Sequence, residues 1–560
     1  MFVKRSWSYY KGKKYVTSQI AEAYRDPETG KVCHNVIMNL GGLPQHVIDS
    51  IDYALKTGES VAGRDVKVTS GDTLWGAGLM AVLRAWKKEK MDRALQDLTE
   101  AERQSAMAMV AARILQPSSK LALKEVLADS VLGRGLSKKR LCEDELYRVM
   151  DKLHENFYSI QKRLAGGRGS SPVLLLYDTT STYFEGTCAE EGQYGYSRDK
   201  RWDRYQVVIG LVTTCEGVPL AVEVWPGSTP DKSTVCEQIR ALRDRFGIEK
   251  AVFIGDKAMH LEASVEELME NGFDYILGLE WREERKQLLA LKPVQLEVMD
   301  EVGVVEWTEG DVRYVGCASE FRRDREQSRR EAGMERAGEQ LERLSATSAR
   351  GRYYSWTRLR EKVNGILKDE GVAGLWKVDI EPIGEIPSPE EKARLRLTFS
   401  PDEEAIKRRE RIEGRYVLQT SLSEDDLSAE EVDQAYRGLH KVEQAFRHIK
   451  SYLKIRPVYH YLRRRVRAHV LICFLAFYLV KKMELELREK GVTREAERLL
   501  RHWDQLRMVE FKVKVGRHER NEWQWSLGEG GKEVKGEIDA LGWWRSMDAY
   551  RRSLLKSADN

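Results

Sequence analysis

The sequence predicts an α/β protein in which a mixed sheet is flanked by helices. Between residues 172 and 279, three strand-like runs are followed by helix, strand, helix and strand, an order typical of this class. Apolar positions with helical spacing precede and follow this region. The 560 residues, 42% of them hydrophobic, are enough for several domains with sizeable cores.

Residues 1–165 are predicted to be an N-terminal DNA-binding region, a small β unit followed by helices. Tyr15–Tyr24 and Val32–Leu40 flank a DPETG turn at 26–30, which indicates a hairpin. From Leu74 onward, runs such as LWGAGLMAVLRAW have the spacing of amphipathic or buried helices. Basic residues between these helices could grip duplex DNA, and an ordinary helical packing domain explains the pattern equally well.

Residues 166–284 are expected to form the first part of the sheet. The predicted strands are Val173–Tyr177, Gln206–Thr214, Val218–Val224, Ala251–Ile254 and Phe273–Leu279. The second and third of them flank a short turn and indicate a hairpin. The first is an apolar run that ends at Asp178, and the fourth ends in Gly255-Asp256.

The alternation of strand and helix stops at residues 285–430, which we predict to be a largely β insertion domain. Its segment 320–344 is dominated by charged residues and indicates an exposed helix. Helical patterns return at 431–490, the predicted second part of the core. Residues 491–560 are expected to be a C-terminal extension.

Several protein classes are excluded by the sequence. The seven cysteines are scattered and never form CxxC, which argues against a disulfide framework and a zinc site. The most apolar run, Ala468–Val480, is too short to cross a bilayer and indicates a buried helix. With no apolar signal segment at the N-terminus, we expect a cytoplasmic protein without membrane contact. Walker loops, HExxH and a Ser/His/Asp arrangement are not apparent, so ATPase, zinc-protease and esterase activities have no support.

One stretch is unusually basic for a chain with a net charge of only +4. Residues 436–467 carry ten Lys or Arg, and Glu443 is their only acid. Such a surface suits a phosphate backbone, whose counterions are released when a protein binds. A single carboxylate within it could hold a divalent cation against the same phosphate.

Two aspartates share the local context of a metal site. Asp178 and Asp256 each follow a buried strand, so they could meet at one edge of the sheet. Close carboxylates repel each other unless a cation neutralises them, and Mg²⁺ or Mn²⁺ prefers oxygen ligands. For either aspartate alone, capping of a following turn or helix is the better explanation. Glu443 is the third candidate, because it shares one helix face with Tyr436 and Lys450.

Four blocks of sequence resemble the insertion-sequence DDE transposases. They are YDTTSTYFEG at 177–186, GYSRDKRWDRYQVVIGL at 195–211, GDKAMHLEASVEELMENGFDYILGLE at 255–280 and YRGLHKVEQAFRHIKSYLKIRPVYH at 436–460. The nearest match is the insertion-sequence-four group and its relatives, which carry a β-rich insertion between the second Asp and the Glu. The resemblance covers about residues 170–485.

The group's fingerprint is Y-x2-R-x3-E-x6-K. Tyr436, Glu443 and Lys450 match it, but Leu439 stands where Arg is usual. The Arg contact to phosphate is therefore unassigned, with His440 and Lys441 as candidates to replace it.

The resemblance implies an RNase-H-like fold in which Asp178, Asp256 and Glu443 form the catalytic, metal-binding triad. Two Mg²⁺ ions, with Mn²⁺ as an alternative, would support in-line phosphoryl transfer. Members of the group bind the double-stranded ends of their element, cut the DNA and join the freed 3′ ends to target DNA. Synapsis of two ends implies a homodimer during the reaction.

The remaining predicted contacts are basic or aromatic. The expected DNA-binding residues are Tyr436, Lys450, Arg447, Lys454 and Lys257, with a basic loop of Arg198, Lys200, Arg201 and Arg204 as a further candidate. Trp307 could stack on a flipped base, although ordinary packing is the better explanation. Two other functions stay open: a catalytically silent, transposase-derived DNA-binding protein, and an RNase-H-like nuclease.

Overall fold

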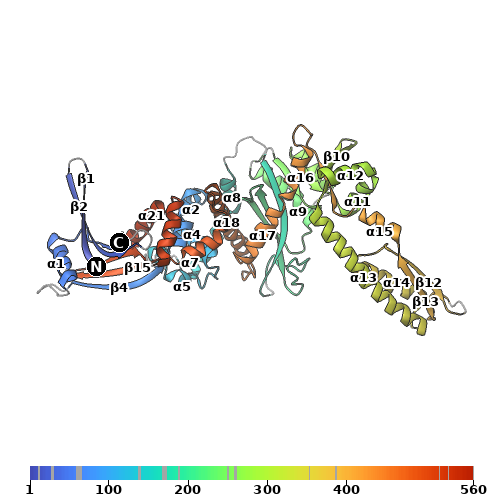
Figure 1. Cartoon of the computed structure of the whole chain (residues 1–560), viewed down its shortest axis with the longest axis horizontal. Coiled ribbons are helices and arrows are strands. Elements are labelled where there is room, and N and C mark those ends of the chain that lie inside the picture. Colours follow the sequence, from blue (N-terminus) through green and yellow to red (C-terminus); the bar gives the residue numbers. More distant parts are fainter. Residues whose placement is uncertain are drawn as a thin grey trace.

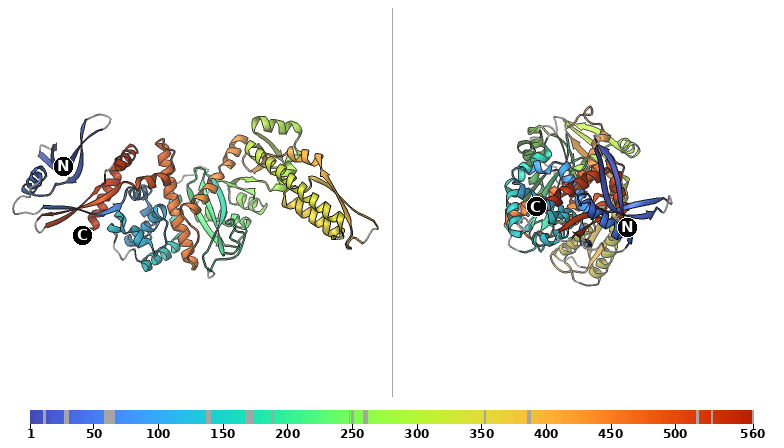
Figure 2. Two further views of the ribbon diagram at one scale, coloured as in Figure 1. Left: turned by 60° about the horizontal axis from the view of Figure 1, so that its bottom comes forward. Right: turned by 90° about the vertical axis from the view of Figure 1, so that its left-hand side faces the viewer.

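The computed structural model shows an elongated molecule (Figure 1). A small sheet lies at one end, a large mixed sheet in the middle and an arm of helices at the other end, and a second view shows the same order (Figure 2). Both chain termini lie at the end with the small sheet. The structure describes residues 1–10, 13–26, 31–57, 66–136, 141–166, 173–186, 189–246, 248, 251–257, 262–351, 353–384, 388–515, 518–526 and 529–558.

The central sheet has eight strands in the order β10-β11-β14-β9-β8-β5-β6-β7. Its first five strands along the chain are β5 (Val173–Tyr183), β6 (Gln206–Thr214), β7 (Pro219–Pro226), β8 (Ala251–Gly255) and β9 (Asp274–Gly278). β8 runs parallel to β5 and to β9, whereas β6 is antiparallel to β5 and β7. This mixed sheet confirms the predicted RNase-H-like α/β fold.

Helices cover both faces of this sheet, and β6 and β8 are buried at every position. On one face, α9 (Asp231–Asp244) and α10 (Glu262–Glu270) enclose a core around Leu175 and Phe253. The other face packs against α17 (His440–Ser451) and α18 (Arg463–Glu489). The apolar run predicted to be a buried helix is the middle of α18.

The first strand is longer than predicted. The apolar run stops before Asp178, but β5 continues to Tyr183 because four Ser and Thr residues follow and pair with β6. β-branched Thr side chains suit a strand, and here they are buried. Asp178 therefore lies in the middle of β5.

The residues between β9 and α16 (Ala429–Arg437) hold more helix than the predicted largely β insertion. They form α11 (Trp281–Ala290), α12 (Pro293–Val302), β10 (Val304–Glu309), β11 (Val312–Ala318), α13 (Glu320–Arg350), α14 (Trp356–Asp369), β12 (Trp376–Pro382), β13 (Leu395–Pro401), α15 (Glu403–Glu410) and β14 (Arg415–Thr420). α13 is the expected exposed charged helix. Three strands rejoin the central sheet, while α13, α14 and the β12–β13 hairpin form the arm (Figure 1).

The N-terminal region and the C-terminal extension form one unit. The first strands β1 (Phe2–Tyr10), β2 (Lys13–Arg25) and β3 (Val32–Asn39) make a sheet beside α1 (Gln45–Thr57). β2 pairs with β3 as the predicted hairpin, whose turn residues 27–30 lie outside the described part. A second sheet joins β4 (Val66–Trp75) to β15 (Arg507–Val515) and β16 (His518–Trp525).

A helical bundle connects this end to the central sheet. The helices before residue 166 are α2 (Ala77–Lys88), α3 (Met91–Ala94), α4 (Glu100–Leu115), α5 (Leu123–Ala128), α6 (Val131–Gly135), α7 (Glu143–Glu155) and α8 (Phe157–Ala165). The later ones are α19 (Ala496–Trp503), α20 (Glu529–Ala540) and α21 (Trp544–Ala558), whereas α16 packs on the central sheet. α18 packs on α4 and α7 and thereby joins the bundle to the sheet. In the described residues no helix is both long and apolar enough to span a membrane.

Candidate active site

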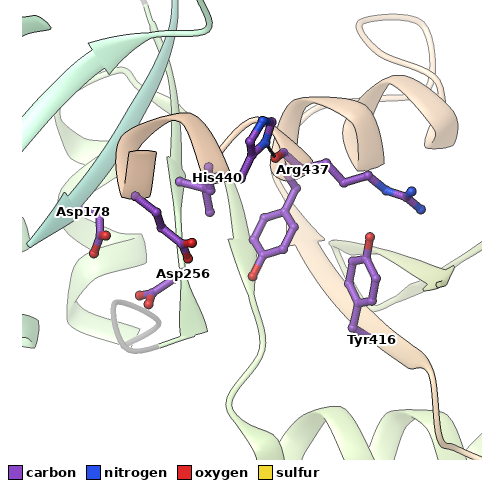
Figure 3. Close-up of a pocket in the computed structure, with 8 residues that line it drawn as sticks. Asp178, Asp256, Tyr416, Arg437 and His440 are labelled. Atoms are coloured by element: carbon purple, nitrogen blue, oxygen red, sulfur yellow. Dashed lines mark hydrogen bonds between the residues drawn. The ribbon is translucent and has the colours of Figure 1, made fainter. Parts of the chain in front are cut away.

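The register of the sheet brings Asp178 and Asp256 level with each other. β5 and β8 are parallel neighbours in which Leu176 lies opposite Ile254. Two residues further on, Asp178 is level with Asp256, which directly follows the end of β8. Neighbouring strands lie about 4.8 Å apart, so the two carboxylates face the same space (Figure 3).

Glu443 reaches the same cavity from a helix. It stands in the first turn of α17, whose Val442, Ala445, Phe446 and Ile449 are buried against the core. Glu443 itself is exposed. A cavity of about 230 Å³ is lined by Asp178, Asp256, Tyr416, Tyr436, Arg437, Leu439, His440 and Glu443. Three carboxylates that are far apart in the sequence thus surround one space.

The electrostatics of this cavity favour a cation. Burial, together with the negative charges of Asp256 and Glu443, raises the pKa of Asp178 to about 7, against the opposing effects of Arg198 and the Thr179 N–H. The ligand oxygens of the three carboxylates do not all lie within 4.8 Å of one another. They are therefore farther apart than they would be around a single bound ion. The donors are oxygens, the ligands that Mg²⁺ and Mn²⁺ prefer. In donor type, the residues present therefore fit divalent metal ions.

Tyr436 lies close to the carboxylates and to the end of β9. Its hydroxyl is packed so tightly against Gly278 that a Cβ there would overlap it. Burial raises the pKa of Tyr436, and the charge of Asp256 raises it further. Its ring lies 5.9 Å from that of Tyr416. The phenol therefore stays a neutral hydrogen-bond donor beside the three carboxylates.

The two candidates for the missing arginine have different surroundings. Leu439 and His440 both line the cavity, whereas Lys441 donates to the Cys215 carbonyl and points away. Arg437 lines the cavity too, but its guanidinium donates to Asp433 at 2.8 Å and extends away from the aspartates (Figure 3). His440 is thus better placed than Lys441.

The structure also brings in Arg198, which the sequence assigned only to a basic loop. Its Nη1 lies 3.8 Å from Asp178 Oδ1, and its Nη2 donates to the Thr179 hydroxyl at 2.9 Å. Asp178 Oδ1 also accepts the Thr179 N–H at 2.7 Å. The spacing of residues along the sequence does not indicate this contact, because Arg198 lies in the loop between β5 and β6 and folds back onto β5.

Lys450, a predicted phosphate contact, is paired with an acid. Its Nζ donates to Asp199 Oδ1 at 2.9 Å, and Arg456 pairs with the same carboxylate. The side chains of Lys450 and Asp199 are only 11% and 6% exposed. Burial lowers the pKa of Lys450, while Asp199 opposes this effect. Lys450 therefore ties the end of α17 to the loop that also carries Arg198.

The other predicted DNA-binding residues differ in whether an ion pair neutralises their charge. Lys257 pairs with the buried Glu284 of α11, which also accepts from Arg322 at 3.0 Å. Arg447 and Lys454 are exposed, and among the described residues their side chains have no partner. Of the predicted DNA-binding residues, these two carry a positive charge that no described carboxylate neutralises.

Trp307 is engaged in packing. Its ring stacks on Tyr314 with centroids 5.8 Å apart, and its indole N–H donates to Gln287 at 3.3 Å. A separate group, His502, Glu533 and Glu537, has ligand atoms close enough to hold a metal. It lies in the C-terminal extension, away from the three carboxylates.

Comparison with known families identifies the chain. Residues 169–479 match the Transposase DDE domain, a match that spans more than half of the sequence. The protein is a DDE transposase. In this transposase, residues 3–68 also match the IS1634 family transposase N-terminal domain, so it belongs to an insertion sequence, and the predicted insertion-sequence-four group is a close relative.

Other comparisons add less. No curated protein matches the transposase. Among solved structures, it is similar to a piggyBac transposase synaptic complex with hairpin DNA, at 10% identity and a TM-score of 0.35 over 76% of each chain.

Proposed function

We propose that this transposase binds the terminal inverted repeats of its element, cuts the DNA and joins the 3′ ends to target DNA. Asp178, Asp256 and Glu443 would hold two Mg²⁺ ions, or Mn²⁺. The observation that carries the proposal is the convergence of these three carboxylates, from two strands and a late helix, on one cavity. When bound, the ions supply the charge neutralisation and nucleophile activation of in-line phosphoryl transfer.

Residues around the carboxylates would position the DNA. The neutral Tyr436 hydroxyl and the His440 ring line the cavity, where a scissile phosphate would lie. Arg447 and Lys454 would contact the backbone directly. Lys450 and Lys257 would contact the same DNA while they stay paired with Asp199 and Glu284. In the synaptic complex two copies would act as a homodimer in the host cytoplasm.

Cleavage of a labelled duplex that ends in the element's inverted repeat tests the proposal. Asp178→Asn, Asp256→Asn and Glu443→Gln should each abolish cleavage with Mg²⁺, because each removes one anionic ligand. The three variants should still bind the same duplex in EDTA. Asp203→Asn, which changes an exposed aspartate, is the matched control and should cleave normally. A variant that cleaves like wild type would remove its residue from the triad.

The products separate this proposal from its alternatives. A catalytically silent DNA-binding protein would bind the ends without Mg²⁺-dependent cutting. An RNase-H-like nuclease would cut but would leave no joint molecules with target DNA. Strand-transfer products from an inverted-repeat substrate are expected only of the proposed transposition reaction.

A further inference from the structure

Two segments beside the active site carry a cluster of exposed aromatic side chains. The aromatic surface consists of Tyr194 (57% exposed), Tyr196 (76%), Trp202 (57%), Tyr459 (70%) and Tyr461 (56%). Tyr196 and Trp202 pack edge to face with centroids 5.5 Å apart. Rings of this size are normally buried, and a group of them on a surface usually marks a binding site.

The two segments form one surface because backbone hydrogen bonds join them. The Val458 N–H donates to the Tyr183 carbonyl at 2.9 Å, and the Glu185 N–H donates to the Val458 carbonyl at 3.0 Å. Further along, the Glu190 N–H donates to the Tyr461 carbonyl at 2.9 Å. The rings after β5 therefore stay beside those that follow α17.

This surface continues directly from the catalytic carboxylates. The loop that carries Tyr196 and Trp202 also carries Arg198, which lies 3.8 Å from Asp178. Asp199, the next residue, anchors the end of α17 through Lys450 at 2.9 Å. A DNA strand held at the carboxylates could pass straight onto the rings.

On the aromatic surface, the charged side chains without an ion-pair partner among the described residues are lysines. Lys200 and Lys454 are exposed, and no carboxylate of the described residues pairs with either of them. The arginines nearby are neutralised, since Arg201 pairs with Asp203 and Arg204 with Glu185. A partner that matches this surface needs flat rings and negative charge together.

We propose that the aromatic surface binds an unpaired DNA strand next to the cleavage site, with bases stacked on the rings and phosphates on Lys200 and Lys454. This inference rests on the proposed function. Bases stack on aromatic side chains regardless of sequence, and only an unpaired strand exposes their faces. A second copy of the chain is the less suitable partner, because the cores of protein interfaces are depleted in lysine.

The test compares two fluorescent DNA probes of one sequence, a blunt duplex and a duplex with a short single-stranded thymine extension. Binding of each to the full-length transposase is measured in EDTA. Wild type should bind the extended probe more tightly. Trp202→Ala with Tyr459→Ala should reduce that preference by roughly tenfold or more per stacked base, and should leave affinity for the blunt duplex unchanged.

Two control variants make the outcome decisive. Trp202→Phe with Tyr459→Phe keeps the rings and should keep the preference, which separates stacking from misfolding. Tyr353→Ala removes a ring of similar exposure, 60%, from a site in the insertion and should change nothing. Equal affinity of wild type for the two probes would overturn the inference, as would loss of self-association in the Ala variants with unchanged DNA binding. Because no metal is present, failure of the cleavage proposal would leave this result intact.

Discussion

Replacing Asp178 with Asn should stabilise the metal-free transposase at alkaline pH while it abolishes cleavage. In the folded protein, burial and then the charges of Asp256 and Glu443 raise the pKa of Asp178 from 3.8 to about 7. A shift of about 3 pKa units corresponds to roughly 4 kcal/mol at about 1.4 kcal/mol per unit. Because the side chain keeps 18% exposure, water screens part of this cost, and we expect about 2–4 kcal/mol.

Proton binding by Asp178 determines how the stability of the folded protein changes with pH. Between pH 3.8 and about 7 the folded protein holds a proton on Asp178 that the unfolded chain has lost, so the stability of the wild type falls as pH rises through this window. Above about pH 7, the full free-energy cost of burying the charged Asp178 carboxylate is present. Asn does not titrate, so the advantage of the variant should grow from pH 5 to pH 8 and then level off.

Thermal unfolding in EDTA at both pH values measures this difference. The variant should melt several degrees above wild type at pH 8 and by a smaller margin at pH 5. Saturating Mg²⁺ should stabilise wild type more than the variant, because ions that bind only the folded state stabilise it. Asp203→Asn is the control: Arg201 lowers the pKa of Asp203 to about 2, so its removal should not stabilise. Equal melting of Asp178→Asn and wild type at pH 8 in EDTA would refute the reasoning.

Three further predictions test other parts of the structure. Gly278→Ala places a Cβ against the Tyr436 hydroxyl and should lower cleavage roughly tenfold while the DNA affinity measured in EDTA changes little. His440→Ala should also lower cleavage roughly tenfold, as loss of one polar contact to phosphate would, whereas Lys441→Ala should stay within about twofold of wild type. Glu486→Gln weakens a partly buried pair with an arginine of α2, formed by bonds of 2.6 and 2.9 Å, and should cost about 1–3 kcal/mol in urea unfolding.

The fold of the central sheet could be predicted because its signals are local. Strands buried on both faces are continuous apolar runs, and β6 is buried at every position. Asp256 follows such a run directly, and the phase of α17 is fixed by the apolar residues around Glu443. These three signals need only a few neighbouring residues each.

What the sequence could not provide depends on contacts between distant segments. β4 pairs with β15, more than 400 residues later, so the chain ends form one unit that neither end indicates alone. β14 rejoins the sheet beside β9 after the whole insertion. The same limit applies at the active site, where Arg198 and Asp199 meet Asp178 and Lys450 only in the folded chain.

These distant contacts explain how an exposed glutamate can still be well positioned. One side of α17 is fixed by burial of Val442 and Phe446, and its last turn is held by Lys450 on the buried Asp199. The helix therefore cannot rotate about its axis without exposing apolar surface and breaking a buried ion pair. Side chains held by packing and ion pairs keep their geometry before a ligand arrives. The position of Glu443 opposite Asp178 and Asp256 is thus set by the fold itself, and Asp199→Ala should weaken Mg²⁺-dependent cleavage although Asp199 does not line the cavity.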